Sequence, residues 1–210
     1  MKRNTTRANI IKAAFAIFSK EDFDRATMRS IAQKARIVPS NIYKYFENKD
    51  ELLSALLDIV AEQIMDGAKE GLLDISGTRE KIFKLTWYYL DYYQNNPGLT
   101  YLIYGRNTLQ HWYEYHSIYN RARELGNMLL SIIEEGQKKG DVRPDVDLHI
   151  ISHIYHGGLR TLVTSWIYHN HDFQLTDSAR QFADSIYFAV GARTIGTDTF
   201  ICPYYKEHNK

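Results

Sequence analysis

A short run of residues near the N-terminus combines the side-chain types that proteins use to read double-stranded DNA. Its first members are small or polar, which lets a helix approach base edges, and the later ones are aromatic or basic, which suits thymine methyl groups and phosphates. Ile42 and Phe46 fall on the other side of the same helix and are expected in the core. The candidate DNA-contacting residues of this run are Pro39, Ser40, Asn41, Tyr43, Lys44 and Tyr45.

The distribution of charge also indicates a nucleic-acid partner for this end of the chain. Residues 1–50 hold eleven Lys and Arg against five Asp and Glu, a net charge of +6, and because the whole chain carries +1, the remainder carries −5. Basic side chains displace the counterions condensed on phosphates. Lys49 lies in the first turn of an expected helix, where free amides and an ammonium together can hold a phosphate. A solvated basic face is the alternative interpretation.

Histidines spaced along one expected helix raise the possibility of a metal site. His149, His153 and His156 follow one another at i, i+4 and i+7, with His169 and His171 nearby. The first and third are about 10 Å apart along a helix axis, too far for one straight helix to bring all three to one ion. We therefore favour a surface or interface stripe, expect no metal and no cofactor, and keep a helical metal-dependent enzyme as the less favoured alternative.

No other pattern indicates catalysis. The chain has no nucleophile elbow, phosphate loop or HExxH pair, and its acids form no catalytic constellation. Its single cysteine, Cys202, rules out an intramolecular disulfide framework. We expect a protein that is not an enzyme.

Aromatic residues crowd the region after residue 80. Tyrosine combines apolar area with a hydroxyl that needs a partner, so a tyrosine-rich helical interior suits a partly apolar ligand, although core packing alone explains most of these rings. The candidate ligand-binding residues are Tyr89, Tyr93, Tyr101, Arg106, Trp112 and Trp166.

The elements that must position these residues are expected to be helices throughout, because apolar residues recur at helical spacing and strand-like alternation is hard to find. The head has a first helix starting near Thr5 or Thr6, a second capped by Thr27, a third over about 39–45, and a fourth from Asn48 with a capping box to Glu51. Further helices are expected near 78–96, 99–137 (broken around Arg106), 145–169 and 176–193.

This organisation predicts two domains without a flexible linker. Residues 1–50 form a DNA-binding domain, residues 51–195 a ligand-binding and dimerisation domain, and residues 196–210 a C-terminal tail, with the fourth helix joining head and body. No run of about 18 apolar residues and no signal-peptide pattern occurs, so we expect a cytoplasmic protein.

The string TMRSIAQKARIVPSNIYKYFENKDELL, over residues 27–53, closely resembles the signature of the TetR family of transcriptional regulators. The resemblance is motif-grade over about residues 8–57 and architectural beyond. It implies an all-α fold with an N-terminal three-helix helix-turn-helix domain and a larger helical bundle. It also implies a dimeric repressor of palindromic operator DNA that a small molecule releases, and it adds Thr27 and Arg29 to the expected DNA contacts.

Two positions depart from the family pattern. Most members have glycine where Arg36 stands, at a turn position for which a positive φ is expected, so the turn is either reshaped or mildly strained here. A Ser or Thr cap is usual where Val38 stands, and Pro39 offsets part of that loss because its missing amide hydrogen costs nothing in a first helical turn.

The C-terminal half, around residues 135–166, loosely resembles the fatty-acid-responsive members, which implies an amphipathic acyl compound such as acyl-CoA as effector, with aromatic or cationic compounds second. A DNA-binding structural protein without an effector is the alternative. The last two expected helices resemble those that pair across the twofold axis in the family. Their expected interface residues are Gly157, Gly158, Leu159, Leu162, Val163, Phe182, Ile186 and Val190.

Overall fold

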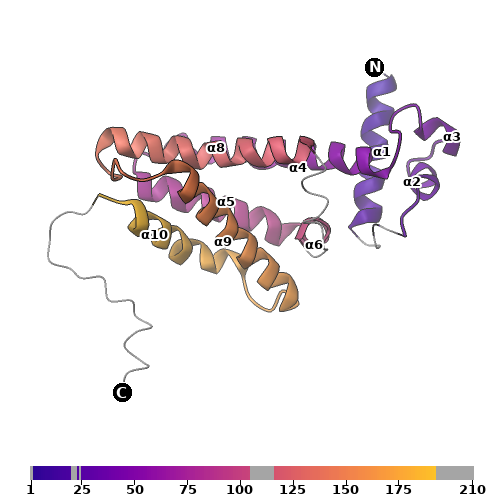
Figure 1. The fold of residues 1–210 in the computed structure, drawn as a ribbon. Helices are drawn as coiled ribbons and strands as arrows, with labels where there is room; N and C mark the ends of the chain where they lie inside the picture. The colour runs from indigo at the N-terminus through magenta and orange to yellow at the C-terminus, as the bar shows by residue number, and fades with distance from the viewer. Residues whose placement is uncertain (1, 20–22, 24, 105–115, 193–210) are drawn as a thin grey trace.

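The protein is helical, as expected. The computed structural model describes residues 2–19, 23, 25–104 and 116–192, and within them β structure is limited to one isolated bridge between Val142 and Gly191. Figure 1 shows a small head of three helices at one end of an elongated bundle, with α4 running from the head into the body. None of the helices in the described ranges combines the length and apolar character that crossing a bilayer requires.

The head consists of α1 (Lys2–Phe18), α2 (Met28–Lys34) and α3 (Pro39–Ile42). α1 begins earlier than the expected Thr5 or Thr6. The three helices enclose a small apolar core that the first turns of α4 complete, and this burial holds the short helices in place. Its fully buried members include Ile10, Ala14, Phe18, Ile31, Ala32, Ile42, Phe46 and Leu52.

Local hydrogen bonds explain where α2 and α3 begin and end. The Thr27 hydroxyl accepts from the Ser30 amide at 3.0 Å, and the Ser30 hydroxyl accepts from the Thr27 amide at 3.2 Å, which confirms Thr27 as the N-cap of α2. α3 ends at Ile42, earlier than expected, because the next amides bond three residues back: Tyr45 N donates to the Ile42 carbonyl at 2.9 Å.

α4 (Lys49–Leu72) is the long helix shared by head and body. Asn48 caps it, as predicted, by accepting from the Glu51 amide at 2.8 Å. The Glu51 carboxylate accepts from the Glu47 amide at 2.6 Å, one residue further back than the expected capping box. The start of α4 is therefore anchored to the segment that follows α3.

The body packs its helices around α5, which contacts α4, α8 and α10. The helix bounds are close to those expected near 78–96, 145–169 and 176–193, while residues 105–115, where the break near Arg106 was expected, lie outside the described residues. The elements are α5 (Thr78–Asn95), α6 (Pro97–Tyr104), α8 (His116–Lys139), α9 (Leu148–Tyr168), a 3₁₀ turn η1 (Leu175–Asp177) and α10 (Ser178–Val190).

Ion pairs join α5 to its neighbours. Arg79 binds both carboxylate oxygens of Asp184 on α10, at 2.9 and 2.8 Å. On the other side, Lys81 donates to Glu135 of α8 at 2.6 Å, and Lys139 donates to the same carboxylate at 2.6 Å. These hydrogen bonds, first from Lys139 and then from Lys81, lower the pKa of Glu135 to about 2.

The structure corrects half of the expected dimer interface. Leu159 and Val163 of α9 and Ile186 and Val190 of α10 are buried in the core of the protomer itself. The sequence pattern marked them as apolar but did not show which apolar stripe faces inward. Because their area is already covered within one chain, these four residues do not form a surface for a second copy.

Candidate nucleic-acid interface and effector site

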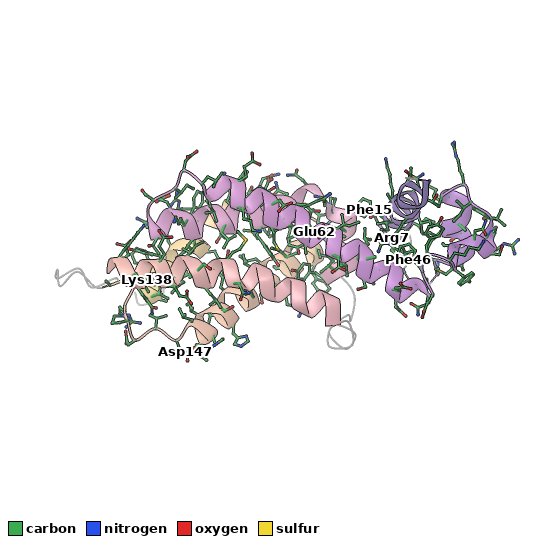
Figure 2. All side chains as sticks on the ribbon, turned by 90° about the horizontal axis from the view of Figure 1, so that it is seen from above. Arg7, Phe15, Phe46, Glu62, Lys138 and Asp147 are labelled. Atoms are coloured by element: carbon green, nitrogen blue, oxygen red, sulfur yellow. The ribbon has the colours of Figure 1, made fainter. Side chains whose placement is uncertain are left out.

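Four of the six residues predicted to contact DNA on and after α3 are exposed. Pro39, Ser40, Tyr43 and Lys44 lie at the surface, and Asn41 and Tyr45 are half-buried. The helix is oriented by its opposite face, where Ile42 and Phe46 are buried as expected. The Arg7 guanidinium of α1 lies 5.1 Å from the centre of the Phe46 ring, and Figure 2 shows the two side chains close together. The head thus presents one polar and aromatic face on a fixed apolar base.

Two further predicted contacts lie at the start of α2. Arg29 is exposed. The Thr27 hydroxyl accepts the hydrogen bond that caps the helix and keeps its own hydrogen as a donor. Thr27 can therefore cap α2 and donate to a phosphate at the same time.

Lys49 has a contact that the sequence did not predict. Its ammonium donates to the carbonyl of Phe23 at 2.7 Å and lies 4.6 Å from the centre of the Phe23 ring. The partner is 26 residues away in the chain, so no local pattern indicated it. The contact ties the loop before α2 to the first turn of α4 and fixes where the ammonium lies on the head.

The turn between α2 and α3 has the positive φ that is usual for glycine at this position, although the residue here is Arg36. Arg36 adopts φ +58°. Its amide donates to Gln33 O at 3.0 Å and the Ile37 amide donates to Ala32 O at 3.0 Å, the Schellman pattern that usually carries glycine. The turn therefore keeps its shape, and a side chain in this region costs roughly 1 kcal/mol. Val38, as expected, gives α3 no side-chain cap, and Pro39 occupies its first turn.

In the body, buried tyrosine hydroxyls meet between α5 and α6. Tyr89 and Tyr104 are hydrogen-bonded at 2.9 Å, and Tyr104 donates to Tyr93 at 3.5 Å. The rings pack edge to face, with the centre of Tyr93 4.9 Å from Tyr89 and 5.2 Å from Tyr104. Burial raises the pKa of all three hydroxyls, that of Tyr93 and Tyr104 well above the usual range. The tyrosine cluster, defined as Tyr89, Tyr93 and Tyr104, therefore offers neutral hydrogen-bonding groups.

A second buried hydroxyl pair links α5 to α9. The Thr86 hydroxyl lies 3.1 Å from the Tyr155 hydroxyl and donates to the carbonyl of Ile82 at 2.7 Å. Burial raises the pKa of Tyr155. Arg160 of α9 is half-buried and its charge acts on Tyr89 and Tyr104, lowering their pKa slightly against the larger effect of burial. Tyr104, Thr86 and Arg160 were not among the predicted ligand residues, because pairing through three-dimensional packing has no signature in the sequence.

Two other predicted ligand residues, Tyr101 and Trp166, do not join the tyrosine cluster. Tyr101 is 54% exposed. Trp166 is buried, and its indole nitrogen donates to the carbonyl of Phe173 at 2.9 Å, which gives it a structural role in the loop after α9. Arg106 and Trp112 lie outside the described residues.

The histidine stripe separates into exposed and buried parts. His149 and His153 are exposed, whereas His156 is largely buried and its Nε2 has no hydrogen-bond partner among the described residues. Burial, with a smaller effect from His153, lowers the pKa of His156 to about 4. In the described parts of the chain, no three His, Cys, Asp or Glu side chains are grouped as a metal site requires.

Comparison with known families places both halves of the chain. Residues 10–56 match the family described as bacterial regulatory proteins, tetR family, and residues 117–188 match the YsiA-like protein, C-terminal region. Two solved structures share the fold. FadR from Bacillus halodurans superposes with a TM-score of 0.79 at 20% identity, over 90% of this chain and 97% of that one. FadR from Bacillus subtilis, in complex with stearoyl-CoA, gives 0.78 at 18% identity, over 86% and 97%.

Curated relatives extend over most of the chain. The repressor NicS of Pseudomonas putida is 30% identical over 152 residues, which cover 71% of this chain and 70% of NicS. The fatty acid metabolism regulator protein of Bacillus subtilis is 21% identical over 169 residues, covering 79% and 86%. The nucleoid occlusion factor SlmA of Marinobacter nauticus is 21% identical over 142 residues, covering 68% and 71%. With the helix-turn-helix head, the shared fold and these relatives together, the chain belongs to the TetR family of bacterial transcriptional regulators.

Proposed function

We propose that the protein is a repressor that binds a palindromic operator as a homodimer and leaves it when a small amphipathic or aromatic effector binds the body. The observation that carries the proposal is the exposed face of α3 and of the turn after it, where Ser40, Tyr43 and Lys44 are held outward by the buried Ile42 and Phe46. The N-terminal residues of such a helix reach base edges in the major groove, and flanking side chains position the head on phosphates.

Each of the expected domains is proposed to have its own function. Residues 1–50 would bind DNA, residues 51–195 would bind the effector and the second copy, and residues 196–210 would form a tail. In support, α1 to α3 pack on one another at one end of the molecule, and α4 runs from them directly into the body.

A second copy of the chain is proposed to cover an exposed apolar surface on α9 and α10. Ile150, Ile154 and Gly157 follow one another at i, i+4 and i+7 on the outer face of α9, and the two isoleucines are 57% and 55% exposed. Phe188 of α10 is also 57% exposed. The two helices run antiparallel, with Arg143 N bonded to Val190 O at 2.9 Å and Phe182 packed over Gly158, so Phe188 lies at the same end as Ile150. We call these four residues the outer apolar stripe.

The outer apolar stripe keeps part of the predicted interface and replaces the rest. Gly157 remains, because a Cβ built there would meet nothing within 4 Å and a partner helix can approach closely. Gly158, Leu162 and Phe182 are half-buried and lie beside the stripe. Apolar side chains this exposed in a row commonly mark a contact with another protein.

The effector is proposed to meet the tyrosine cluster. Neutral hydroxyls suit a ligand group that exchanges hydrogen bonds, the surrounding Leu and Ile side chains suit an apolar part, and Arg160 suits an anionic group. An acyl-CoA combines these properties, and the structure of a FadR from Bacillus subtilis contains stearoyl-CoA. Aromatic compounds are the second class.

Two contacts can pass the effector's influence to the head. α4 packs on α5 and α8 in the body and carries Lys49 at its other end. α6 ends in Tyr104 of the tyrosine cluster and begins at Pro97 beside the end of α1, where a Cβ on Gly98 would come within 2.6 Å of the Ser19 Cβ. Movement of α4 or α6 would change the spacing of the two recognition helices, and such coupling typically amounts to about 1–3 kcal/mol.

The test is a selection of genomic DNA fragments with purified protein, starting with the DNA upstream of its own gene, followed by footprinting and effector titration. A protected palindrome of roughly 15–30 base pairs that stearoyl-CoA or an aromatic compound releases would support the proposal. Salt-sensitive binding without a preferred site would contradict it.

A DNA-binding protein without an effector is the second candidate. It is favoured by the relative named nucleoid occlusion factor SlmA. Such a protein would bind DNA with little sequence preference, and small molecules would not release it, so footprinting and effector titration separate the two functions.

A further inference from the structure

Arg36 occupies a backbone position that favours glycine over a residue with a long side chain. Its φ of +58° lies in the left-handed region, and it stands at the residue after the C-cap of α2, where the Schellman turn favours glycine. The turn does not avoid the problem by reshaping, because both of its characteristic hydrogen bonds are present at 3.0 Å. An arginine is therefore held here against the preference of the backbone.

Nothing within the described chain offsets this strain. The Arg36 side chain is exposed and forms no hydrogen bond or ion pair with the residues that the structure describes. Strained residues that persist without an internal benefit commonly serve binding. The benefit must then come from outside the protomer.

The position of Arg36 indicates which external group that is. Arg36 lies three residues before Pro39, the first residue of the recognition helix, and the exposed Lys34 precedes it on the same turn. Both cations belong to a head with a net charge of +6. A guanidinium forms two parallel hydrogen bonds with a phosphate, which a glycine at this turn cannot do.

We propose that Arg36 is an additional DNA-backbone contact of this protein, which binds a phosphate beside the groove that α3 enters. The contact is sequence-independent: it raises affinity and fixes the head on the duplex without choosing bases. This inference rests on the proposed DNA-binding function and adds a residue at a position where most of the family has glycine.

Four substitutions separate charge from strain. R36G removes both, R36A removes the charge and keeps the strain, and R36K keeps charge and strain. K69A, on the exposed side of the body half of α4, removes a charge far from the turn and serves as the matched control. Each variant is tested for binding to a 30-base-pair duplex of random sequence by titration from about 50 to 200 mM salt, and for its melting temperature.

The expected results differ between the variants. R36G and R36A reduce the slope of log K against log salt by about 0.9 for each bound protomer, because one phosphate contact is lost, whereas R36K and K69A leave it unchanged. R36G also melts about 2–4 °C higher than the natural protein, because the strain is relieved. The two effects together show an arginine kept for DNA at the expense of stability.

Other outcomes overturn the inference or its basis. If the natural protein binds the duplex and R36G and R36A show its full salt slope, the phosphate contact is wrong and the proposed function survives. If R36A changes base preference on a selected operator, Arg36 reads bases and the proposal is also wrong. If the natural protein binds no duplex at any salt concentration, the proposed function fails and this inference fails with it.

Discussion

Lys49 holds two parts of the head together through a single side chain. Its ammonium bonds to the Phe23 carbonyl at 2.7 Å and lies over the Phe23 ring, which joins the loop before α2 to the start of α4. The same ammonium is positioned at the end of α4 that faces α3, where a phosphate is proposed to bind. The contact with Phe23 and the proposed phosphate contact therefore involve the same group.

We expect Lys49→Ala to lower both stability and DNA affinity. Loss of the charged hydrogen bond and of the cation–π contact should reduce the free energy of unfolding by about 1–2 kcal/mol, measured by urea denaturation. Binding should weaken evenly for an operator and for its single-base variants. A loss confined to one base pair would show that Lys49 reads sequence.

His156 should make the protein sensitive to acid. The His156 side chain has a pKa near the ordinary 6.5 in the unfolded chain and of about 4 in the folded protein. Between these two values unfolding is accompanied by uptake of a proton, so stability falls as the pH drops from 6.5 to 4. The effect is on the order of 3 kcal/mol. Melting curves of His156→Leu should show a smaller drop over this range, while the exposed His149→Gln should follow the natural protein; equal drops in all three would refute the assignment.

At the residue scale, local chemistry was predictable from the sequence and long-range pairing was not. Thr27 and Asn48 could be recognised as caps because capping involves neighbours within three residues. For Arg36 the turn pattern left a reshaped turn and a strained residue open, and the structure has the strained residue, with a positive φ. The contact between Lys49 and Phe23 and the hydroxyl pair of Thr86 and Tyr155 depend on packing across 26 and 69 residues, which one sequence does not reveal.

At the scale of elements, the start of α6 in the body packs closely on the end of α1 in the head. Gly98 at the start of α6 lies against Ser19, whose carbonyl oxygen would be 2.7 Å from an added Cβ. Backbone atoms cannot rotate away as a side chain can, so α6 or α1 must shift to accept any larger residue.

Gly98→Ala should therefore change both stability and regulation. Overpacking of this kind costs about 1–3 kcal/mol, visible as a lower melting temperature. The shift should also alter how strongly the effector weakens operator binding, measured as the ratio of the two dissociation constants. Gly77→Ala is the control, since the added Cβ would meet Glu80 atoms at 3.9 Å or more. An unchanged ratio in Gly98→Ala would exclude this contact from the coupling.

The boundaries and types of the elements were largely predictable from the sequence. Which face of each helix points into the core was not. Helical periodicity located α5, α9 and α10 to within a few residues. On α9 and α10, however, apolar residues occur on two sides, and periodicity cannot tell the stripe that faces α5 from the stripe that faces outward. Leu159 and Val163 were therefore assigned to the partner when they belong to the protomer core.

At the scale of the whole molecule, the outer apolar stripe predicts the oligomeric state. Ile154→Arg should convert the dimer to monomers in sedimentation velocity, because a charge would be buried at the centre of the interface. Leu73→Arg is the matched control, since Leu73 is 79% exposed at the end of α4 and is not part of the stripe on α9 and α10. A dimer that persists in Ile154→Arg, or one lost equally in Leu73→Arg, would refute this interface.

The long shape of the molecule has a consequence for how it meets DNA. A head with a net charge of +6 and a remainder with −5 are held apart by α4, whose 24 residues span about 36 Å. Opposite charges at the two ends of a rod form a permanent electric dipole. The field of a nucleic-acid duplex exerts a torque on that dipole and turns the head forward before contact, so body-first collisions separate quickly. This orientation operates within a Debye length, about 8 Å at physiological salt, and fades as salt is added.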